Sequence, residues 1–345
     1  MPHVLVTGGA GFFGGILKRH LLRHRHHVTS LDLAPDPYRH PHLTRITGDV
    51  RDPWFLNSVF RRARYDAVFH CAAVVPRGSY SEDDLWTTNV NATRMIAKTC
   101  AQSGVPKLVH ISSSCLWGGK PGRAIREDDP PSPVDLYGES KLAAEHELCS
   151  FSGSVETVIL RSPAIVDRAP RGLLAIILDF IHAGKTLWTI GDAANRCQIV
   201  FAEDLVRACI AALRPGFSGI LHIGNPGVKT LRELWQAVID AAGTGSVIRA
   251  LPPKPARFAL RLASMLGLSS LTPYESRMIA DDFFFDTSKI RERLGWRPSL
   301  TCEQTLVQIY RDSTSRREQT RPRGQIFDWS GPAPVGVIRL LKWVS

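Results

Sequence analysis

The sequence predicts an α/β protein with a Rossmann-like, doubly wound parallel sheet, followed by a smaller, mostly helical C-terminal lobe. Two observations support this prediction. Short runs rich in β-branched residues alternate with amphipathic, helix-like stretches through the first half of the chain, which is typical of β-α-β units. In addition, the first of these runs leads through a glycine-rich turn into a helix-like stretch, as the first strand of a Rossmann fold does.

The first half of the chain contains six expected strands and four expected helices. The strands are short apolar runs bounded by turn residues, at His3–Thr7, His27–Asp32, Leu43–Gly48, Ala67–His70, Lys107–Ser112 and Glu156–Arg161. The helices have apolar residues at three- and four-residue spacing, at Gly14–Arg25, Pro53–Arg64, Leu85–Ser103 and Leu136–Phe151. Because parallel strands need crossover connections, these helices should cover both faces of the sheet.

After Pro163 the alternation stops and helix-like stretches dominate. Helices are expected at Leu173–Ala183, Glu203–Leu213, Thr230–Ala242, Lys289–Leu294 and Thr301–Arg311, and isolated strands at Leu187–Ile190 and Ile220–Ile223. We therefore expect a Rossmann domain over residues 1–165, a helical lobe over 166–310 and a tail over 311–345. Residues around Leu187–Asp204 should return to support the first domain.

The tail has two parts. Arg311–Arg323 carries five arginines and is expected to be a basic linker that leaves the folded body. Val335–Val344 places Arg339 and Lys342 among bulky apolar residues, so it is expected to be an amphipathic helix. Such a helix can make peripheral contact with a membrane surface, or it can pack on its own protein or on a partner subunit.

The composition is that of an ordinary globular protein. Of the 345 residues, 44% are hydrophobic and 22% charged, which excludes global disorder. Lys and Arg outnumber Asp and Glu by 43 to 32; this excess favours acidic partners without choosing among phosphorylated substrates, nucleic acid and anionic lipid. The seven cysteines form no C-x-x-C pair. This pattern indicates reduced thiols. The N-terminus does not resemble a signal peptide, and no apolar run is long enough to span a bilayer. Together these observations predict a cytoplasmic protein.

The glycine-rich turn has the spacing T-G-x-x-G-x-x-G from Thr7 to Gly14. Gly8 permits a sharp turn, Gly11 lets the backbone approach a pyrophosphate, and Gly14 permits close packing of the helix on the strand. Phe12 and Phe13 open the helix, whose free N–H groups and positive dipole end face the phosphates. The turn therefore predicts a dinucleotide site.

Asp32 stands 18 residues beyond Gly14, at the end of the second expected strand. A carboxylate there can accept hydrogen bonds from the adenosine ribose hydroxyls, and it would repel the 2′-phosphate of NADP. Asp32 therefore favours NAD, although Arg39 and Arg45 lie nearby in the sequence.

The glycine spacing resembles the extended short-chain dehydrogenase/reductase family, which contains the NAD-dependent epimerases and dehydratases, and four further motifs match over about residues 3–310. They are Gly48–Asp52, His70–Ala73, Asn89–Thr93 with Ala92 in place of the usual glycine, and Leu294–Pro298. The resemblance implies that NAD is held by Asp49 and Val50 at the adenine, by Cys71, Ala72 and Ala73 along the fourth strand, and by Asn89 and Pro163. It also implies that residues 1–165 bind NAD and that 166–310 form the substrate-binding lobe.

The expected catalytic residues are Tyr137, Lys141 and Ser113. Tyr137 and Lys141 are four residues apart and so share one helix face; an ammonium beside a phenol favours the phenolate, which can take a proton from a substrate hydroxyl. The resemblance implies that Lys141 also holds the nicotinamide ribose. Counted back from Trp117, the family's serine aligns with Ser113, with Ser112 and Ser114 as neighbouring alternatives.

The family performs epimerisation, dehydration and alcohol oxidation with this residue set. The dehydratase acid–base pair would fall at Ser114 and Cys115, so dehydration is not expected. A nucleotide sugar is the expected substrate. The alternative is an apolar alcohol or ketone, as in the 3β-hydroxysteroid dehydrogenase branch, which Pro252–Arg277 resembles. Two positions favour this apolar alternative. Ala164 and Cys197 stand where nucleotide-sugar enzymes of the family usually have polar residues that bind the substrate, and Arg196 is the nearest arginine.

Two further expectations concern partners and metals. The expected helices at Leu85–Ser103 and Leu136–Phe151 form the dimer interface in relatives, and the apolar residues offered here are Leu136, Leu142, Ala143 and Leu148, so a homodimer is expected. A non-catalytic, nucleotide-sensing or nucleic-acid-associated role is the alternative from another class, disfavoured because Tyr137 and Lys141 are intact. The His20–His27 group has no carboxylate or cysteine beside it, so no metal site is expected.

Overall fold

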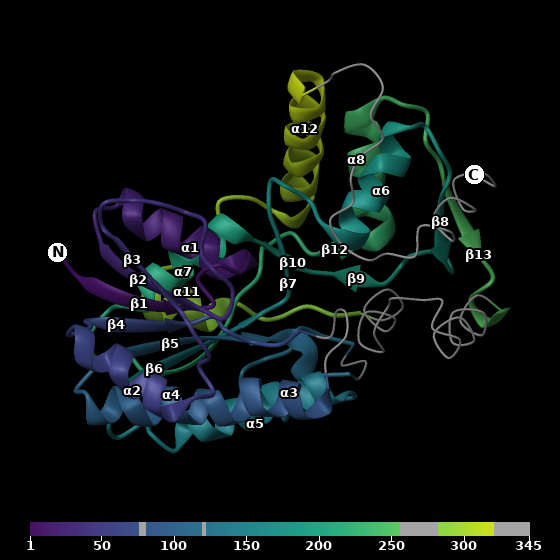
Figure 1. Cartoon of the computed structure of the whole chain (residues 1–345). Helices are drawn as coiled ribbons and strands as arrows, with labels where there is room; N and C mark the ends of the chain where they lie inside the picture. Colours follow the sequence, from purple (N-terminus) through teal and green to yellow (C-terminus); the bar gives the residue numbers. More distant parts are fainter. Residues whose placement is uncertain (76–80, 119–121, 256–281, 321–345) are drawn as a thin grey trace.

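The computed structural model describes residues 1–75, 81–118, 122–255 and 282–320, and its centre is a seven-stranded parallel sheet (Figure 1). The strands are β1 (His3–Thr7), β2 (His27–Asp32), β3 (Leu43–Thr47), β4 (Ala67–His70), β5 (Lys107–Ser113), β6 (Glu156–Ser162) and β11 (Gly219–His222). Their order is β11-β6-β5-β4-β1-β2-β3. From β1, the chain adds β2 and β3 on one side of the sheet and β4, β5 and β6 on the other. The point between β1 and β4, where this order switches, leaves a ligand crevice at the carboxyl ends of the strands.

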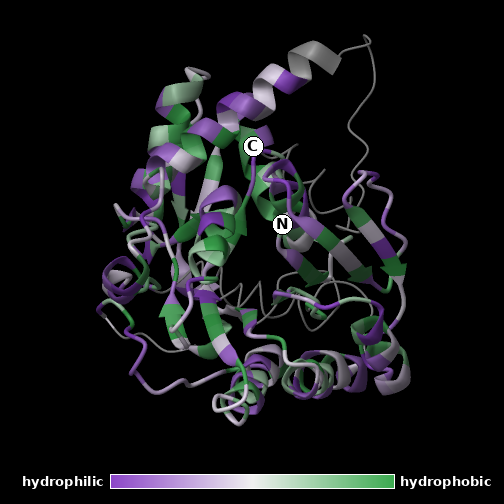
Figure 2. Ribbon diagram, turned by 90° about the vertical axis from the view of Figure 1, so that its left-hand side faces the viewer, coloured by the Kyte–Doolittle hydropathy of each residue, from purple (hydrophilic) through white to green (hydrophobic). Residues whose placement is uncertain are grey.

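Helices cover both faces of this sheet, as the sequence predicts (Figure 1). One face carries α1 (Phe12–Arg23), α7 (Ala202–Ala211) and α11 (Ser288–Leu294), and the other carries α2 (Pro53–Arg62), α4 (Ala92–Gln102) and α5 (Leu136–Cys149). Figure 2 shows the hydrophobic residues in green along the strands between these two layers. The doubly wound α/β prediction is confirmed.

The second half of the chain forms a helical lobe and also completes the sheet. In the lobe, α6 (Gly172–His182), α8 (Leu231–Ala242) and α12 (Cys302–Thr320) share one apolar core. Three two-stranded ladders accompany them: β7 (Ala164–Val166) with β10 (Ile199–Phe201), β9 (Arg196–Cys197) with β12 (Lys229–Thr230), and β8 (Leu187–Ile190) with β13 (Ile248–Leu251). From β10 the chain returns to the first half, because α7 packs on α1 and β11 pairs with β6. The domain limits at residues 165 and 310 stay predictions.

The expected helix Leu85–Ser103 is instead divided into three pieces. It consists of α3 (Glu82–Trp86), a π-helical turn at Thr87–Asn91 and α4. The buried Asn89 lies in that turn and bonds both backbone groups of Val74, accepting from its N–H at 2.8 Å and donating to its carbonyl at 3.0 Å. A π turn inserts one residue into a helix and re-aims the side chains around it; here it directs Asn89 into the protein.

The expected helix Thr301–Arg311 continues to Thr320 as α12. Asp312 lies beyond the predicted end, yet its carboxylate pairs with Arg168 at 3.1 Å. Contrary to the expectation, the chain therefore remains part of the folded body beyond Arg311. The remainder of the basic segment, the Val335–Val344 helix and most of Pro252–Arg277 lie outside the described residues.

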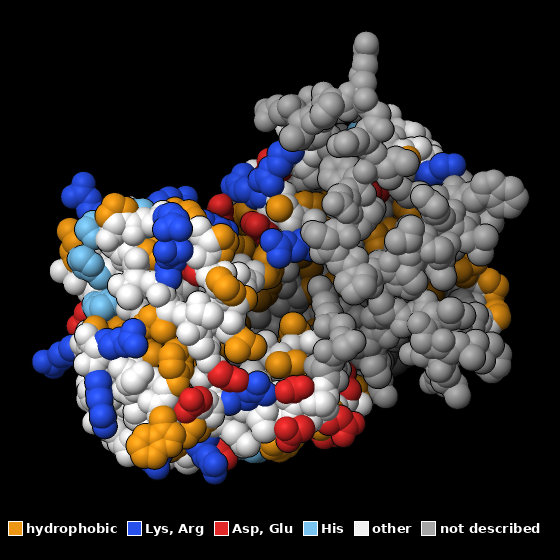
Figure 3. All heavy atoms as spheres, viewed as in Figure 1, with side chains coloured by type: hydrophobic (Ala, Val, Ile, Leu, Met, Phe, Trp, Pro, Cys, Tyr) orange, Lys and Arg blue, Asp and Glu red, His pale blue; other side chains and the backbone are white. Residues whose placement is uncertain are grey.

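The described Lys and Arg side chains are spread over the face shown in Figure 3, and several of them lie beside Asp and Glu side chains. Within the described ranges, no helix is both long enough and apolar enough to cross a bilayer.

Candidate active site

The glycine turn joins β1 to α1 at the carboxyl edge of the sheet. Gly8 has a φ of +70°, and a Cβ atom on it would lie 2.7 Å from the backbone nitrogen of Ala72. A Cβ atom on Gly14 would lie 2.1 Å from the carbonyl oxygen of Gly8. Gly11 is the N-cap, and no side chain caps the helix that begins at Phe12. Because the first N–H groups of a helix lack intrahelical partners, this turn fits the pyrophosphate of a dinucleotide.

Asp32 ends β2 beside this turn. Its Oδ2 accepts a hydrogen bond from the Ala10 N–H at 2.9 Å, and its Oδ1 accepts one from the Ala34 N–H at 3.0 Å. These two bonds hold the partly exposed carboxylate at the edge of the glycine turn, which fits a role on the adenosine ribose. Arg45 donates to the backbone carbonyl of Asp36 at 3.0 Å, and Arg39 is exposed.

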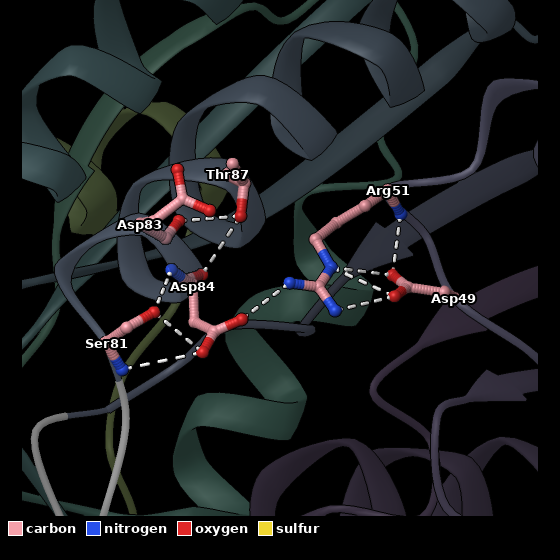
Figure 4. Close-up of polar contacts among 6 residues, drawn as sticks. All are labelled: Asp49, Arg51, Ser81, Asp83, Asp84 and Thr87. Carbon is pink, nitrogen blue, oxygen red and sulfur yellow. Dashed lines mark hydrogen bonds and ion pairs between the residues drawn. The ribbon is translucent and has the colours of Figure 1, made fainter.

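Asp49 is held by Arg51, which bridges two carboxylates (Figure 4). Its guanidinium lies 2.8 Å from Asp49 and 2.9 Å from Asp84, which belongs to the capping box of α3. The hydrogen bonds from Arg51 lower the pKa of Asp49, so that this carboxyl group is ionised. Val50 is buried beside it. Arg51 thus fixes the Asp49 loop against the start of α3, a contact that the sequence analysis missed.

The loop after β4 carries Cys71, Ala72 and Ala73 next to the glycine turn. Asn89 anchors this loop through Val74, and its amide also donates to the Ser140 hydroxyl on α5 at 3.0 Å. Burial raises the pKa of the Cys71 thiol to about 12, so Cys71 is a protonated, compact side chain here. The direct contacts of these residues with NAD stay predictions.

Tyr137 lies in the first turn of α5, which packs closely on the end of β5. Asp135 caps this helix by accepting a hydrogen bond from the Gly138 N–H at 2.8 Å. A Cβ atom on Gly138 would lie 2.3 Å from the Cys115 carbonyl oxygen. Glycine at this position therefore lets the turn that carries Tyr137 approach the segment that follows β5.

The three serines at the end of β5 have different surroundings. Ser112 is buried and donates to the Glu145 carboxylate at 2.5 Å. Ser114 is also buried, whereas Ser113 is partly exposed and its hydroxyl accepts from the Cys115 N–H at 3.2 Å. Ser113 is thus the serine of the three with the most access to a ligand.

Lys141 is 2% exposed and directs its ammonium onto β5. The Nζ atom donates to the Ile111 carbonyl at 2.8 Å and lies 3.0 Å from Nε2 of His110. Burial lowers the pKa of Lys141 from its ordinary 10.5 to about 8, and the carboxylate of Glu145 opposes this shift.

Two buried histidines lie beneath this lysine: His70, which opens the His70–Ala73 motif, and His110, which no sequence motif singled out. His70 bonds Thr7 at 2.8 Å and Thr93 at 2.9 Å, and burial lowers its pKa to about 3, so its ring is neutral. The centroids of the His70 and His110 rings are 5.1 Å apart. The available signal for His110 was a histidine in the middle of the buried run of β5, KLVHISS.

Arg196 is already paired within the protein. Its guanidinium forms an ion pair with Asp282 at 2.7 Å and lies over the Phe284 ring. Pro163 is buried after β6, and Ala164 is exposed at the start of β7. The arginine nearest to the usual diphosphate anchor is therefore engaged by a carboxylate.

The chain belongs to the NAD-dependent epimerase/dehydratase family, whose sequence profile matches residues 4–224. NAD is the cofactor of this family, and the glycine turn and Asp32 fit it. The chain is thus an NAD-dependent enzyme of the extended short-chain dehydrogenase/reductase type, as the sequence predicts.

Three curated relatives illustrate this family. The chain is 35% identical to an uncharacterized protein, y4nG, of Sinorhizobium fredii, over 89% of this chain and 77% of the relative. It is 24% identical to 3beta-hydroxysteroid-dehydrogenase/decarboxylase isoform 1 of Arabidopsis thaliana, over 98% and 86% of the two chains. It is 27% identical to the UDP-glucose 4-epimerase of Mycolicibacterium smegmatis, over 90% and 99%.

A solved structure with the same fold is the Bordetella bronchiseptica enzyme WbmG in complex with NAD and UDP. The TM-score is 0.75, the sequence identity is 21%, and the match covers 90% of this chain and 94% of that one.

Proposed function

We propose that the protein transfers hydride at a secondary alcohol or ketone carbon of a nucleotide sugar, as an epimerase or a dehydrogenase. The observation that supports this most is the place of Lys141, which is buried against β5 one helical turn after Tyr137. The same strand ends at Ser113, and the glycine turn lies at the same edge of the sheet.

In this proposal Tyr137 is the general acid and base. Its phenolate takes the proton of the substrate hydroxyl, or its phenol returns one to a ketone oxygen. The ammonium of Lys141 favours the phenolate and binds the nicotinamide ribose, and Ser113 donates a hydrogen bond to the substrate oxygen. NAD held by these residues would supply the acceptor or the donor of the hydride that the substrate carbon exchanges.

The cofactor is held by residues along the carboxyl edge of the sheet. We assign its pyrophosphate to the turn that contains Gly8, Gly11, Phe12, Phe13 and Gly14. Asp32 binds the adenosine ribose, and Asp49 and Val50 flank the adenine. Cys71, Ala72, Ala73 and Asn89 would line the cofactor after β4, and Pro163 would lie at its nicotinamide.

Support for a nucleotide sugar comes from the UDP-glucose 4-epimerase relative, which is 27% identical to this chain over 99% of its own length. The alternative is oxidation or reduction of an apolar alcohol or ketone, as the name of the Arabidopsis relative suggests. A specific observation favours this alternative: Arg196 pairs with Asp282, so part of its charge is already engaged by a carboxylate and less of it is available for a substrate diphosphate.

Thermal unfolding with saturating NAD tests the substrate class. UDP-glucose and UDP-glucuronic acid form one arm, and 3β-hydroxysteroids form the other. A ligand that binds only the folded protein raises the melting temperature by mass action, so an increase with the nucleotide sugars alone is expected. An increase with the steroids alone would select the alternative. Appearance of NADH in solution then separates a dehydrogenase, which releases its ketone, from an epimerase, which does not.

Replacing Asp32 with Ala is expected to shift cofactor preference toward NADP. The substitution removes the charge that repels the 2′-phosphate, together with the acceptors for the ribose hydroxyls. Dissociation constants of NAD and NADP from calorimetry should show weaker NAD binding and a smaller ratio between the two. A wild-type protein that binds NADP more tightly than NAD would contradict the role given to Asp32.

The folded-state pKa of Lys141 predicts a specific pH dependence of stability. Between about pH 8 and the ordinary pKa of 10.5, the folded protein has lost this proton while the unfolded chain retains it. Stability then rises with pH. From roughly pH 7.5 to 9.5 the wild type should therefore gain about 2 kcal/mol in the free energy of unfolding relative to Lys141→Met. Urea unfolding at several pH values measures this; a difference independent of pH would contradict it.

We also propose a homodimer formed through α4 and α5. Leu136, Leu142 and Ala143 are only partly buried in one chain, and so they can contribute to an interface. Leu148 cannot contribute as expected, because it is fully buried in the core of its own subunit. Light scattering at micromolar concentration should give twice the mass of the chain; a monomer would contradict the proposal.

A further inference from the structure

His110 lies directly beneath Lys141 in the interior of the protein. Its ring is 1% exposed, and its Nε2 atom is 3.0 Å from the lysine Nζ. The second partner of the ammonium is the Ile111 carbonyl at 2.8 Å. Two acceptors on neighbouring residues of one strand therefore set the direction of the lysine head group.

The contact with Lys141 determines the tautomer of His110. An ammonium can only donate hydrogen bonds, so Nε2 must accept, and the proton of a neutral ring must then be on Nδ1. Burial lowers the pKa of His110 well below its ordinary value, so the ring is neutral. Its Nδ1 is buried and has no hydrogen-bond partner among the described residues. Such an unsatisfied group destabilises a fold by about 1–3 kcal/mol, so the placement of His110 costs the folded state stability.

The other titratable groups around this pair do not compete for the ammonium. On β4, His70 is neutral and bonded to two threonines, and the Cys71 thiol after it is protonated. On α5, the Glu145 carboxylate is engaged by Arg161 and by Ser112. Cys115, in the segment after β5, is also near enough to act on Lys141 electrostatically. Among the described residues, the hydrogen bonds of Nζ go to neutral acceptors.

We propose that His110 is a positioning residue: its neutral Nε2 orients the Lys141 ammonium without neutralising it. A carboxylate at this place would form an ion pair, and the charge of the lysine would then be spent on that partner instead of on a phenolate and a ribose. A neutral acceptor holds the head group and leaves its charge available. This inference depends on the role proposed for Lys141 above.

The test compares two substitutions of His110. His110→Leu removes the acceptor, whereas His110→Gln keeps an acceptor oxygen on a side chain of similar reach. In the wild type, NAD affinity should fall as pH rises through the pKa of Lys141, near 8. Without its acceptor the ammonium is less stable, so in His110→Leu this fall should begin at lower pH. The NAD dissociation constant at neutral pH should rise by about tenfold, within the range of one hydrogen bond to a charged group. His110→Gln should restore both values toward those of the wild type.

Two controls separate positioning from loss of fold. His222→Leu also removes a buried histidine, from β11 two strands away from β5, and it should lower the melting temperature without moving the pH at which NAD affinity falls. In addition, ¹⁵N spectra of the wild-type histidines should show His110 protonated at Nδ1. A His110→Leu protein that is folded and has the wild-type pH dependence, or a His110 protonated at Nε2, would overturn the inference.

Lys141→Met distinguishes this inference from the proposed function. If Lys141→Met loses NAD affinity while His110→Leu keeps the wild-type profile, only the role of His110 is wrong. If Lys141→Met itself keeps full NAD affinity and turnover, the proposed site is wrong, and the inference fails with it.

Discussion

Replacing Tyr137 with Phe is expected to lower turnover by about 10²–10⁴-fold, which is the usual contribution of a positioned general acid or base. The ring and its packing in the first turn of α5 remain, and the Asp135 cap on Gly138 does not involve the phenol. Binding of NAD should therefore stay near the wild-type value. Steady-state kinetics and calorimetric titration of NAD measure the two quantities separately.

Tyr65→Phe is the matched control for this substitution. Tyr65 is buried, and its hydroxyl donates to the carbonyl of Val59 on α2. Removing this hydroxyl should leave turnover unchanged. Near-wild-type turnover in Tyr137→Phe, with any substrate that the protein accepts, would mean that the proposed active site is wrong.

The second large effect concerns a buried ion pair behind the site. Arg161 and Glu145 approach to 2.6 Å with side chains that are 4% and 2% exposed. Removing one member of such a pair leaves an uncompensated charge in the interior, and this commonly costs about 3–5 kcal/mol. Glu145→Ala should therefore lower the free energy of unfolding by that amount, measured by urea denaturation.

Two variants identify the buried charge as the cause. The double substitution Glu145→Leu with Arg161→Met removes both charges, and it should recover most of the lost stability. Glu147→Ala, at a less buried glutamate on the same helix, should change stability by less than about 0.5 kcal/mol. If Glu145→Ala resembled Glu147→Ala, the pair would have no structural importance.

The main elements of the fold could be predicted because they depend on local patterns. The strand runs and the glycine turn predict the sheet and its first β-α-β unit, and the close contacts at Gly8 and Gly14 have the expected physical basis. The π turn at Thr87–Asn91 could not be predicted, because its cause is a tertiary contact between Asn89 and Val74. The extension of α12 likewise depends on packing and on the Arg168–Asp312 pair.

The candidate site was predictable to a similar degree. Tyr137, Lys141 and Ser113 follow from spacing and motif order, but their surroundings depend on residues distant in sequence. His110 is 31 positions from Lys141, and Arg51 is 33 positions from Asp84. Spacing along one helix or strand cannot indicate such pairs, since only the fold brings them together.

The return of the chain to its first half has a consequence for synthesis on the ribosome. Strand β11, which borders β6, and helix α7, which covers the apolar face of α1 around Leu17 and Leu21, lie between residues 202 and 222. Until these residues have emerged, the nascent N-terminal half has an open sheet edge and an uncovered apolar helix, both of which favour aggregation. The N-terminal half of this chain therefore cannot finish folding as it is made, and it must wait for a segment translated well after its own last strand, β6.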